Sequence, residues 1–117
     1  MGGVNMAPNI SIALSFLTIG LLTIALCVPL LQGKIKRNAF YGIRTPKAFE
    51  SDELWFKINR YGARQMIMWS AAMVGLGVVT LFFPSADKDL LGMIFGLVVV
   101  VSLIIPTVQI FRYSKKL

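Results

Sequence analysis

The sequence contains no histidine, one cysteine and only five acidic residues. Without histidine the chain cannot build a histidine-containing zinc site, a serine–histidine catalytic pair or a histidine pH switch. Cys27 has no partner for an intramolecular disulfide, and because it lies within an apolar stretch we interpret it as a small hydrophobic residue. The carboxylates form two separate groups, which are Glu50, Asp52 and Glu53, and Asp87 and Asp89. This distribution favours helix capping over acid–base catalysis, so we expect a protein that is not an enzyme and has no metal or other cofactor.

Charged residues are also absent from three long stretches, residues 10–31, 66–83 and 90–111. The chain is 56% hydrophobic with a mean hydropathy of +0.74, whereas a core helix of a soluble protein carries polar residues at every turn. At about 1.5 Å per residue, the first and third stretches match the roughly 30 Å hydrocarbon core of a bilayer, and the second is marginal. We therefore predict an all-α integral membrane protein with three transmembrane helices, forming a single membrane domain over residues 1–117.

The net charge of +7 is distributed unevenly along the chain. Eight of the twelve lysines and arginines lie in residues 32–65 and three in the tail, residues 112–117, whereas only Lys88 lies in the predicted hairpin, residues 84–89. Because cytoplasmic segments of membrane proteins are enriched in basic residues, we expect residues 32–65 and the C-terminus in the cytoplasm, and the hairpin and the N-terminus outside. This topology explains the basic character without nucleic-acid binding. Residues 1–9 contain no lysine or arginine, so we expect the first stretch to be a retained helix rather than a signal peptide.

Small residues recur four positions apart in two of the predicted spans. Ala71 and Gly75 lie in the second span, and Gly92 and Gly96 lie in the third. Such spacing allows close backbone approach in lipid, so we expect these positions to mark helix contacts within the chain, with dimerisation as the alternative. Three helices form a small core, which leaves homo-oligomerisation open.

Residues 32–65 combine eight cations with six aromatic side chains, a composition typical of an element at the membrane–water interface. Thr45 and Pro46 predict one helix start, with threonine as the N-cap and proline at the first helical position. Ser51 predicts a second start, because the acidic residues that follow it suit the first turn of a helix. Polar residues then recur at helical spacing. We therefore predict an amphipathic interfacial helix over residues 52–64, which either ends there or continues into the second span.

Most cations of this segment are expected to face anionic lipid headgroups. They are Lys34, Lys36, Arg37, Lys47 and Lys57. For Arg44 and Arg60 two interpretations stay open, because both lie among aromatic residues, glycines and amides. Each guanidinium either faces the headgroups or points inward, where it pairs with a polar side chain or binds a phosphate.

The most specific pattern of the segment is Asn38-x-x-Tyr41-Gly42-Ile43-Arg44-Thr45-Pro46, followed by Trp55 and by Asn59-Arg60-x-Gly62. With its three flanking apolar stretches, this pattern resembles the SdpI family of bacterial membrane proteins. The resemblance covers nearly the whole chain and implies a short three-helix member in the plasma membrane of a bacterium. The candidate binding residues that it marks are Asn38, Tyr41, Gly42, Arg44, Thr45, Pro46, Trp55, Asn59, Arg60 and Gly62. The chain departs from the family pattern at Ala48, Ala63 and Ser70.

The resemblance implies a non-enzymatic immunity protein that protects a bacterium against a membrane-acting peptide toxin and takes part in signalling by docking a cytoplasmic regulator. On this interpretation the spans and the outer hairpin meet the toxin, and the basic segment meets the regulator. The alternative is a lipid-headgroup-binding protein or an accessory subunit of a membrane transport complex. In that case Arg44 and Arg60, together with Asn38 and Asn59, recognise a headgroup or a partner helix. A neighbouring toxin gene would favour immunity, and a transporter operon would favour the accessory role.

Overall fold

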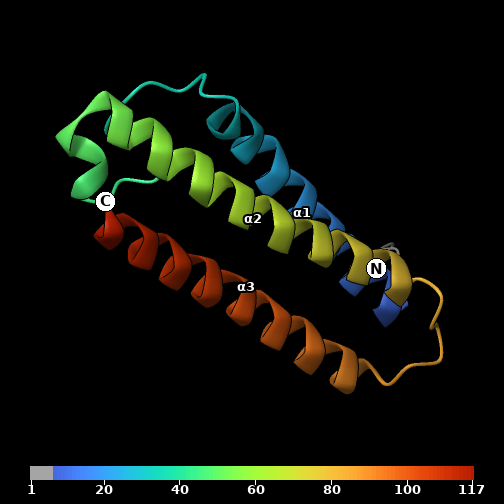
Figure 1. Ribbon diagram of the computed structural model, residues 1–117. Coiled ribbons are helices and arrows are strands. Elements are labelled where there is room, and N and C mark those ends of the chain that lie inside the picture. The colour runs from blue at the N-terminus through green and yellow to red at the C-terminus, as the bar shows by residue number, and fades with distance from the viewer. Residues whose placement is uncertain (1–6) are drawn as a thin grey trace.

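A computed structural model describes residues 7–117, and residues 1–6, which belong to the predicted outer N-terminus, lie outside it. The described chain contains three long helices, α1 (Pro8–Leu31), α2 (Asp52–Thr80) and α3 (Lys88–Lys116), and a short 3-10 helix, η1 (Lys47–Glu50). No strand occurs between residues 7 and 117, so the predicted all-α class is confirmed for this part of the chain. The molecule is elongated, with extents of 53 × 27 × 22 Å (Figure 1).

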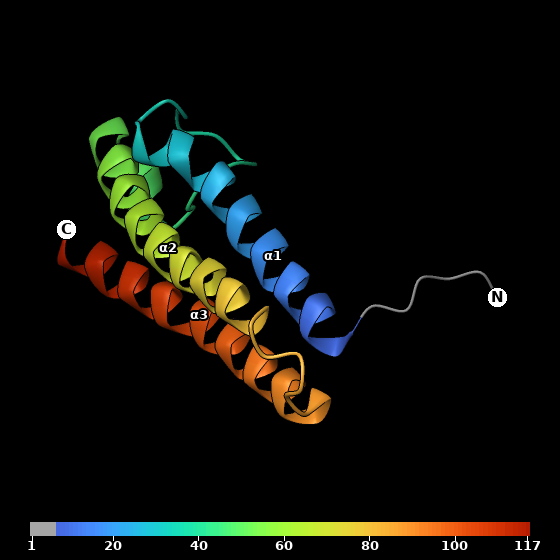
Figure 2. The ribbon, with the colours of Figure 1, turned by 90° about the vertical axis from the view of Figure 1, so that its right-hand side faces the viewer.

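Helix α2 lies between α1 and α3 and runs antiparallel to both (Figures 1 and 2). The α1–α2 loop, residues 32–51, lies at the same end of the molecule as the C-terminus. The start of α1 and the short connection between α2 and α3 lie at the other end. The segments that carry most of the positive charge therefore share one end of the bundle.

Two side-chain caps fix where α2 and α3 begin. The Ser51 hydroxyl accepts a hydrogen bond from the Leu54 N–H at 3.1 Å, as its position before an acidic first turn predicts. Asp87 accepts from the Asp89 and Leu90 N–H groups at 2.7 and 3.3 Å. From its cap α2 continues without a break to Thr80. Residues 52–64, predicted as an amphipathic helix, therefore form one helix with residues 66–80 of the second predicted span, which was expected to reach residue 83.

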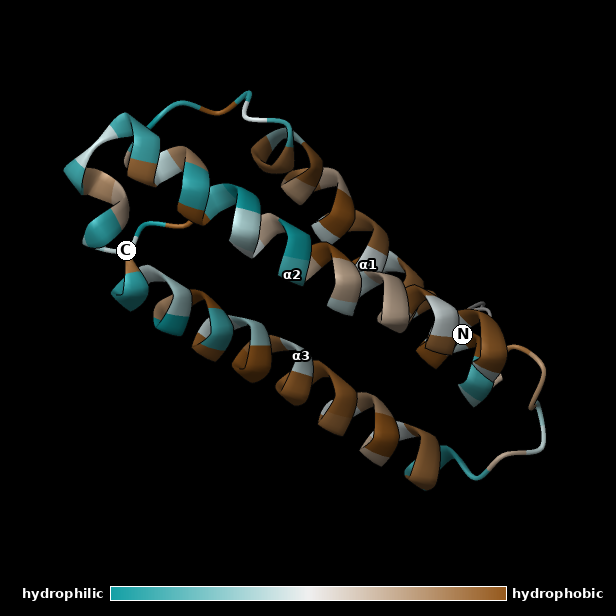
Figure 3. Cartoon of the chain, in the orientation of Figure 1, coloured by the Kyte–Doolittle hydropathy of each residue, from teal (hydrophilic) through white to brown (hydrophobic). Residues whose placement is uncertain are grey.

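Helices α1 and α3 are long and apolar enough to cross a bilayer. Few of their apolar residues are covered: on α3, Leu97 and Leu103 are 65% and 66% exposed, and on α1, Leu22 is 58% exposed. In Figure 3 hydrophobic residues cover most of both helices, whereas the loop half of α2 is hydrophilic. The charge-free part of α2 covers only residues 65–80, which is shorter than the roughly 20 residues of a typical span. Two of the three predicted spans thus have the length and composition of membrane helices.

The closest helix packing is between α1 and α2. It depends on two glycines that do not belong to the small-residue pairs predicted from four-residue spacing. A Cβ atom at Gly20 would lie 2.7 Å from Cγ2 of Val74 and 2.9 Å from the backbone oxygen of Ser70. A Cβ atom at Gly77 would lie 3.0 Å from Cβ of Phe16. The two backbones can approach this closely only because these positions carry no side chain.

The glycines of the two predicted small-residue pairs have a different environment. Gly75, Gly92 and Gly96 have no atom within 4 Å of a Cβ position, so the prediction that they mark contacts within the chain is wrong. The physical reason is helix rotation: four-residue spacing defines a face of the helix but does not say which neighbour that face meets. Helix α3 meets α1 instead through an edge-to-face pair of Phe16 and Phe95, with 4.8 Å between ring centroids.

Candidate functional site

The α1–α2 loop does not extend away from the bundle but folds back against the ends of all three helices. The Tyr41 hydroxyl donates a hydrogen bond to the backbone oxygen of Leu26, more than one turn before the end of α1. Ile43 lies against Gly62 of α2, in a cluster that also contains Ile110 of α3. The motif residues therefore close the end of the helix bundle rather than forming a free loop.

Asn38 shapes the first half of the loop. Its side-chain oxygen accepts hydrogen bonds from the N–H groups of Phe40 and Tyr41 at 2.8 and 2.7 Å. Its amide nitrogen donates to the backbone oxygens of Lys36 and Tyr41 at 2.7 and 2.9 Å. An asparagine can do this because it has both a donor and an acceptor close to its own backbone. Its role here is to form a turn, and this use leaves no part of the amide free for a ligand.

Asn59 holds the second half of the loop on α2. Its side chain is 1% exposed, and its oxygen accepts from the Ile43 N–H at 2.6 Å. Its nitrogen donates to the backbone oxygens of Ile43 and Trp55 at 3.2 and 2.9 Å. The amide thus pairs with both backbone groups of Ile43, as a neighbouring strand would. Gly42 fits beside it with φ +125°, where a Cβ atom would lie 2.9 Å from the Asn59 oxygen.

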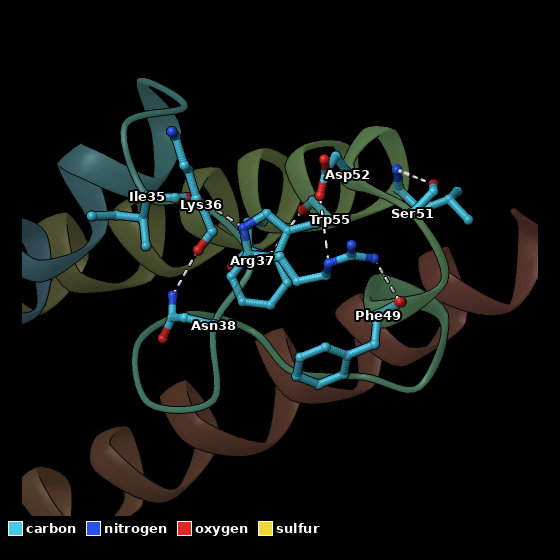
Figure 4. Close-up of polar contacts among 10 residues, drawn as sticks. Ile35, Lys36, Arg37, Asn38, Phe49, Ser51, Asp52 and Trp55 are labelled. Atoms are coloured by element: carbon cyan, nitrogen blue, oxygen red, sulfur yellow. Dashed lines mark hydrogen bonds and ion pairs between the residues drawn. The ribbon is translucent and has the colours of Figure 1, made fainter.

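Trp55 is the largest fully buried side chain of the described residues and joins three segments (Figure 4). Its indole nitrogen donates to the backbone oxygen of Ile35 at 2.9 Å. Its ring lies 5.6 Å from that of Phe49 in η1, measured between centroids. Ala48 of η1, completely buried, belongs to the same apolar cluster. One side chain therefore fixes the start of the loop, the end of the loop and the first turns of α2 together.

Arg37 has two partners within the protein that the sequence analysis did not predict. Its guanidinium donates to the backbone oxygen of Phe49 at 2.9 Å and pairs with Asp52 at 3.4 Å (Figure 4). The prediction considered only the excess of positive charge, whereas the loop brings Arg37 next to the acidic first turn of α2. Arg37 acts as a structural link between the loop, η1 and α2.

The short helix η1 begins at Lys47 with Pro46 as its N-cap, one residue later than the predicted start with Thr45 as N-cap. The Thr45 hydroxyl accepts from the Ala48 N–H at 3.2 Å and lies 3.1 Å from the hydroxyl of Ser114. Both hydroxyl-bearing residues are buried. This contact ties the loop to the last turns of α3, and no sequence pattern predicts Ser114 as a partner.

Arg44 and Arg60 are both exposed, which does not agree with the interpretation that they point inward. The Arg44 guanidinium donates to the backbone oxygen of Ala39 within the loop. Arg60 extends across Gly33, where a Cβ atom would lie 2.7 Å from its Nη2 atom. Between residues 7 and 117 neither forms an ion pair with a carboxylate. Both guanidinium groups therefore face the surroundings of the protein and not the bundle interior.

The model of the SdpI/YfhL protein family matches residues 34–110, which include the whole motif and most of α2 and α3. The chain belongs to the SdpI/YfhL family. No curated protein and no solved structure matches the chain significantly. The SdpI/YfhL assignment and the two apolar helices together support a membrane protein. The family is not a known family of enzymes.

The structure divides the SdpI/YfhL motif into two sets of residues. Most motif positions build the closed end of the bundle, and these are Asn38, Tyr41, Gly42, Thr45, Pro46, Trp55, Asn59 and Gly62. Gly62 belongs to this set because a Cβ atom there would collide with Ile43 and lie 3.1 Å from Ile110. Arg44 and Arg60 form the second set, because only they present charged groups outward. Within residues 7–117 no cluster of three metal-ligating side chains occurs.

Proposed function

We propose that the chain crosses the plasma membrane of a bacterium three times, with α2 as the second span. The support comes from the arrangement of charge. One end of the bundle, formed by the α1–α2 loop, residues 52–64 of α2 and residues 112–117, holds eleven of the twelve basic residues, whereas the opposite end holds only Lys88. Because basic segments of membrane proteins tend to remain in the cytoplasm, we expect the loop and the C-terminus inside and the α2–α3 connection outside. The apolar part of α2 is short, and a bilayer accommodates a short span by local thinning and by flanking polar side chains that extend to the headgroups.

This topology predicts which positions react with a thiol reagent that cannot cross the membrane. In a Cys27→Ser background, Ser85→Cys is expected to be labelled in intact cells, because residue 85 lies in the outer connection. Lys34→Cys is expected to react only after the cells are permeabilised. Labelling would be measured by the gel shift of the full chain. Reaction of residue 34 in intact cells would contradict the proposed orientation.

We further propose that the protein is a non-enzymatic immunity protein of the SdpI type, which protects its cell from a membrane-acting peptide toxin. The observation that carries this proposal is the family match over residues 34–110. The apolar outer surfaces of α1 and α3 suit contact with a toxin in the bilayer. The rigidly closed loop end, with its exposed arginines, suits the docking of a cytoplasmic regulator.

A gene deletion tests the immunity proposal. Cells without the gene are expected to survive less well than wild-type cells when a membrane-acting peptide toxin is added, and expression of the full chain should restore survival. Plating efficiency and membrane potential would be measured, with a non-ionic detergent as the control challenge, to which both strains should respond equally. Unchanged survival under every peptide toxin tested would overturn the proposal.

A further inference from the structure

A groove of 570 Å³ lies between α2 and the C-terminal part of α3. Its basic residues are Lys57, Arg60 and Arg64 of α2, and Tyr113 of α3 forms part of the opposite side. The ring of Tyr113 stacks on that of Tyr61, with 4.0 Å between centroids and 11° between planes. We call this feature the basic groove. Neither the family motif nor the loop contacts account for it, because only Arg60 belongs to the motif.

The positive charge of the basic groove is not neutralised by the protein. Lys57, Arg60 and Arg64 follow one another at intervals of three and four residues, so they lie on one stripe of α2, and all three are exposed. Glu53 also lines the groove. The two ion pairs found within residues 7–117 join other residues, so Glu53 does not pair with these cations. Three cations against one carboxylate, with no partner in the described chain, favour an anionic ligand.

The position of the groove along the helices indicates the kind of anion. On α2 the charge-free stretch begins at Gln65, directly after Arg64, and on α3 it ends at Phe111, two residues before Tyr113. The groove thus lies where both helices change from apolar to charged sequence. In a bilayer this boundary is the level of the lipid phosphates.

A second groove of 320 Å³ lies on the same two helices, nearer to their apolar parts. It begins one turn further along each helix, with Gln65 following Tyr61 on α2 and Gln109 preceding Tyr113 on α3. Met68, Trp69 and Ala72 complete its lining. A small free anion would gain nothing from this mainly apolar groove, because it has no apolar part to bury. A lipid could bury part of an acyl chain there.

We propose that the basic groove binds the phosphate of an anionic phospholipid, with an acyl chain in the adjoining α2–α3 groove. Guanidinium groups bind phosphate oxygens with two parallel hydrogen bonds, and Lys57 adds a point charge at the rim. The stacked Tyr61 and Tyr113 rings form a rigid wall that limits the headgroup. This inference depends on the proposed membrane embedding but not on toxin immunity.

Native mass spectrometry of the full chain, purified in a neutral detergent, tests the proposal. Phosphatidylglycerol or phosphatidylcholine would be added at equal concentrations, and the fraction of protein that retains one lipid would be measured. Phosphatidylglycerol is expected to bind better, and Arg60→Gln/Arg64→Gln should weaken its binding by roughly tenfold or more, since each lost cation near a phosphate costs several-fold. Lys34→Gln/Lys36→Gln removes the same charge from the loop and should leave the binding unchanged.

A second variant separates lipid binding from folding. Arg64→Gln alone leaves Arg60 in place over Gly33, and it should still weaken phosphatidylglycerol binding severalfold while the far-ultraviolet circular dichroism stays the same. If Lys34→Gln/Lys36→Gln lost as much phosphatidylglycerol binding as the groove variants, the attraction would be unspecific and the proposal would be overturned. Unchanged phosphatidylglycerol binding in all variants would also overturn it. Displacement of the lipid by soluble glycerol phosphate at the same concentration would overturn the lipid assignment in favour of a free anion. Retention of a glutamate-rich peptide but not of phosphatidylglycerol would overturn it in favour of a protein partner.

Discussion

Replacing Trp55 by alanine is expected to release the α1–α2 loop from α2. The indole is completely buried, donates a hydrogen bond to Ile35 and packs on Phe49, so its removal leaves a large cavity and an unpaired backbone oxygen. Truncation of a buried tryptophan costs about 3 to 5 kcal/mol. Because the helices themselves do not need Trp55 to form, we expect most of this cost to appear as local opening of the loop.

Limited trypsin digestion of the full chain in detergent measures this opening. Cleavage after Arg44 and Lys47 should be at least about a hundredfold faster in Trp55→Ala than in the wild type, because every 1.4 kcal/mol changes the open population tenfold. Trp69→Ala is the matched control: it is the same change on the same helix, at a half-buried side chain away from the loop. Equal cleavage rates in the two variants would show that Trp55 does not hold the loop.

Gly77→Leu is expected to separate α1 from α2 near the loop-distal end of the bundle. A Cβ atom at this position would already lie 3.0 Å from Cβ of Phe16 and 3.1 Å from the backbone oxygen of Ala13. The remaining leucine atoms would have to occupy the volume of α1 itself. Overpacking of this kind costs about 1 to 3 kcal/mol, and the cost is larger where backbone must move.

Gly75→Leu provides the control, because it makes the same change two residues earlier on the same helix, where no atom lies within 4 Å. Unfolding would be followed by circular dichroism in mixed micelles with increasing fractions of sodium dodecyl sulfate. Gly77→Leu should unfold at a clearly lower fraction than the wild type, and Gly75→Leu should unfold close to the wild type. If the two variants behave alike, the close α1–α2 contact is not present in solution.

The sequence predicted the helices well because their signals are local. Absence of charge located the apolar parts of α1, α2 and α3, and Ser51 located the start of α2. The helix contacts were predicted less well, since they depend on the rotation of each helix about its axis. Gly20 and Gly77 have no small residue four positions away, yet they form the contact between α1 and α2. Gly92 and Gly96 do have this spacing, but no other helix of the described chain lies against them.

The positions of the candidate site were predicted from the motif, but the roles of its residues were not. From the sequence, the amides of Asn38 and Asn59 could equally bind a ligand or stabilise the loop. Only the path of the loop shows that both form hydrogen bonds with backbone groups. The same holds for Arg37, whose partner Asp52 is fifteen positions away and becomes a neighbour only when the loop folds back. The basic groove was missed because it joins one stripe of α2 to Tyr113, and no local pattern links these two segments.

The unbroken course of α2 has a mechanical consequence. Its 29 residues form a rod of roughly 43 Å, and the residues that anchor the loop, Trp55 and Asn59, are fixed to this rod near one tip. If α2 moves as a rigid body, a tilt or twist at Thr80 also moves Ile43 and Ile35, because both are hydrogen-bonded to side chains of α2. Through this one helix, the position of the loop depends on the orientation of α2 at the other end of the bundle.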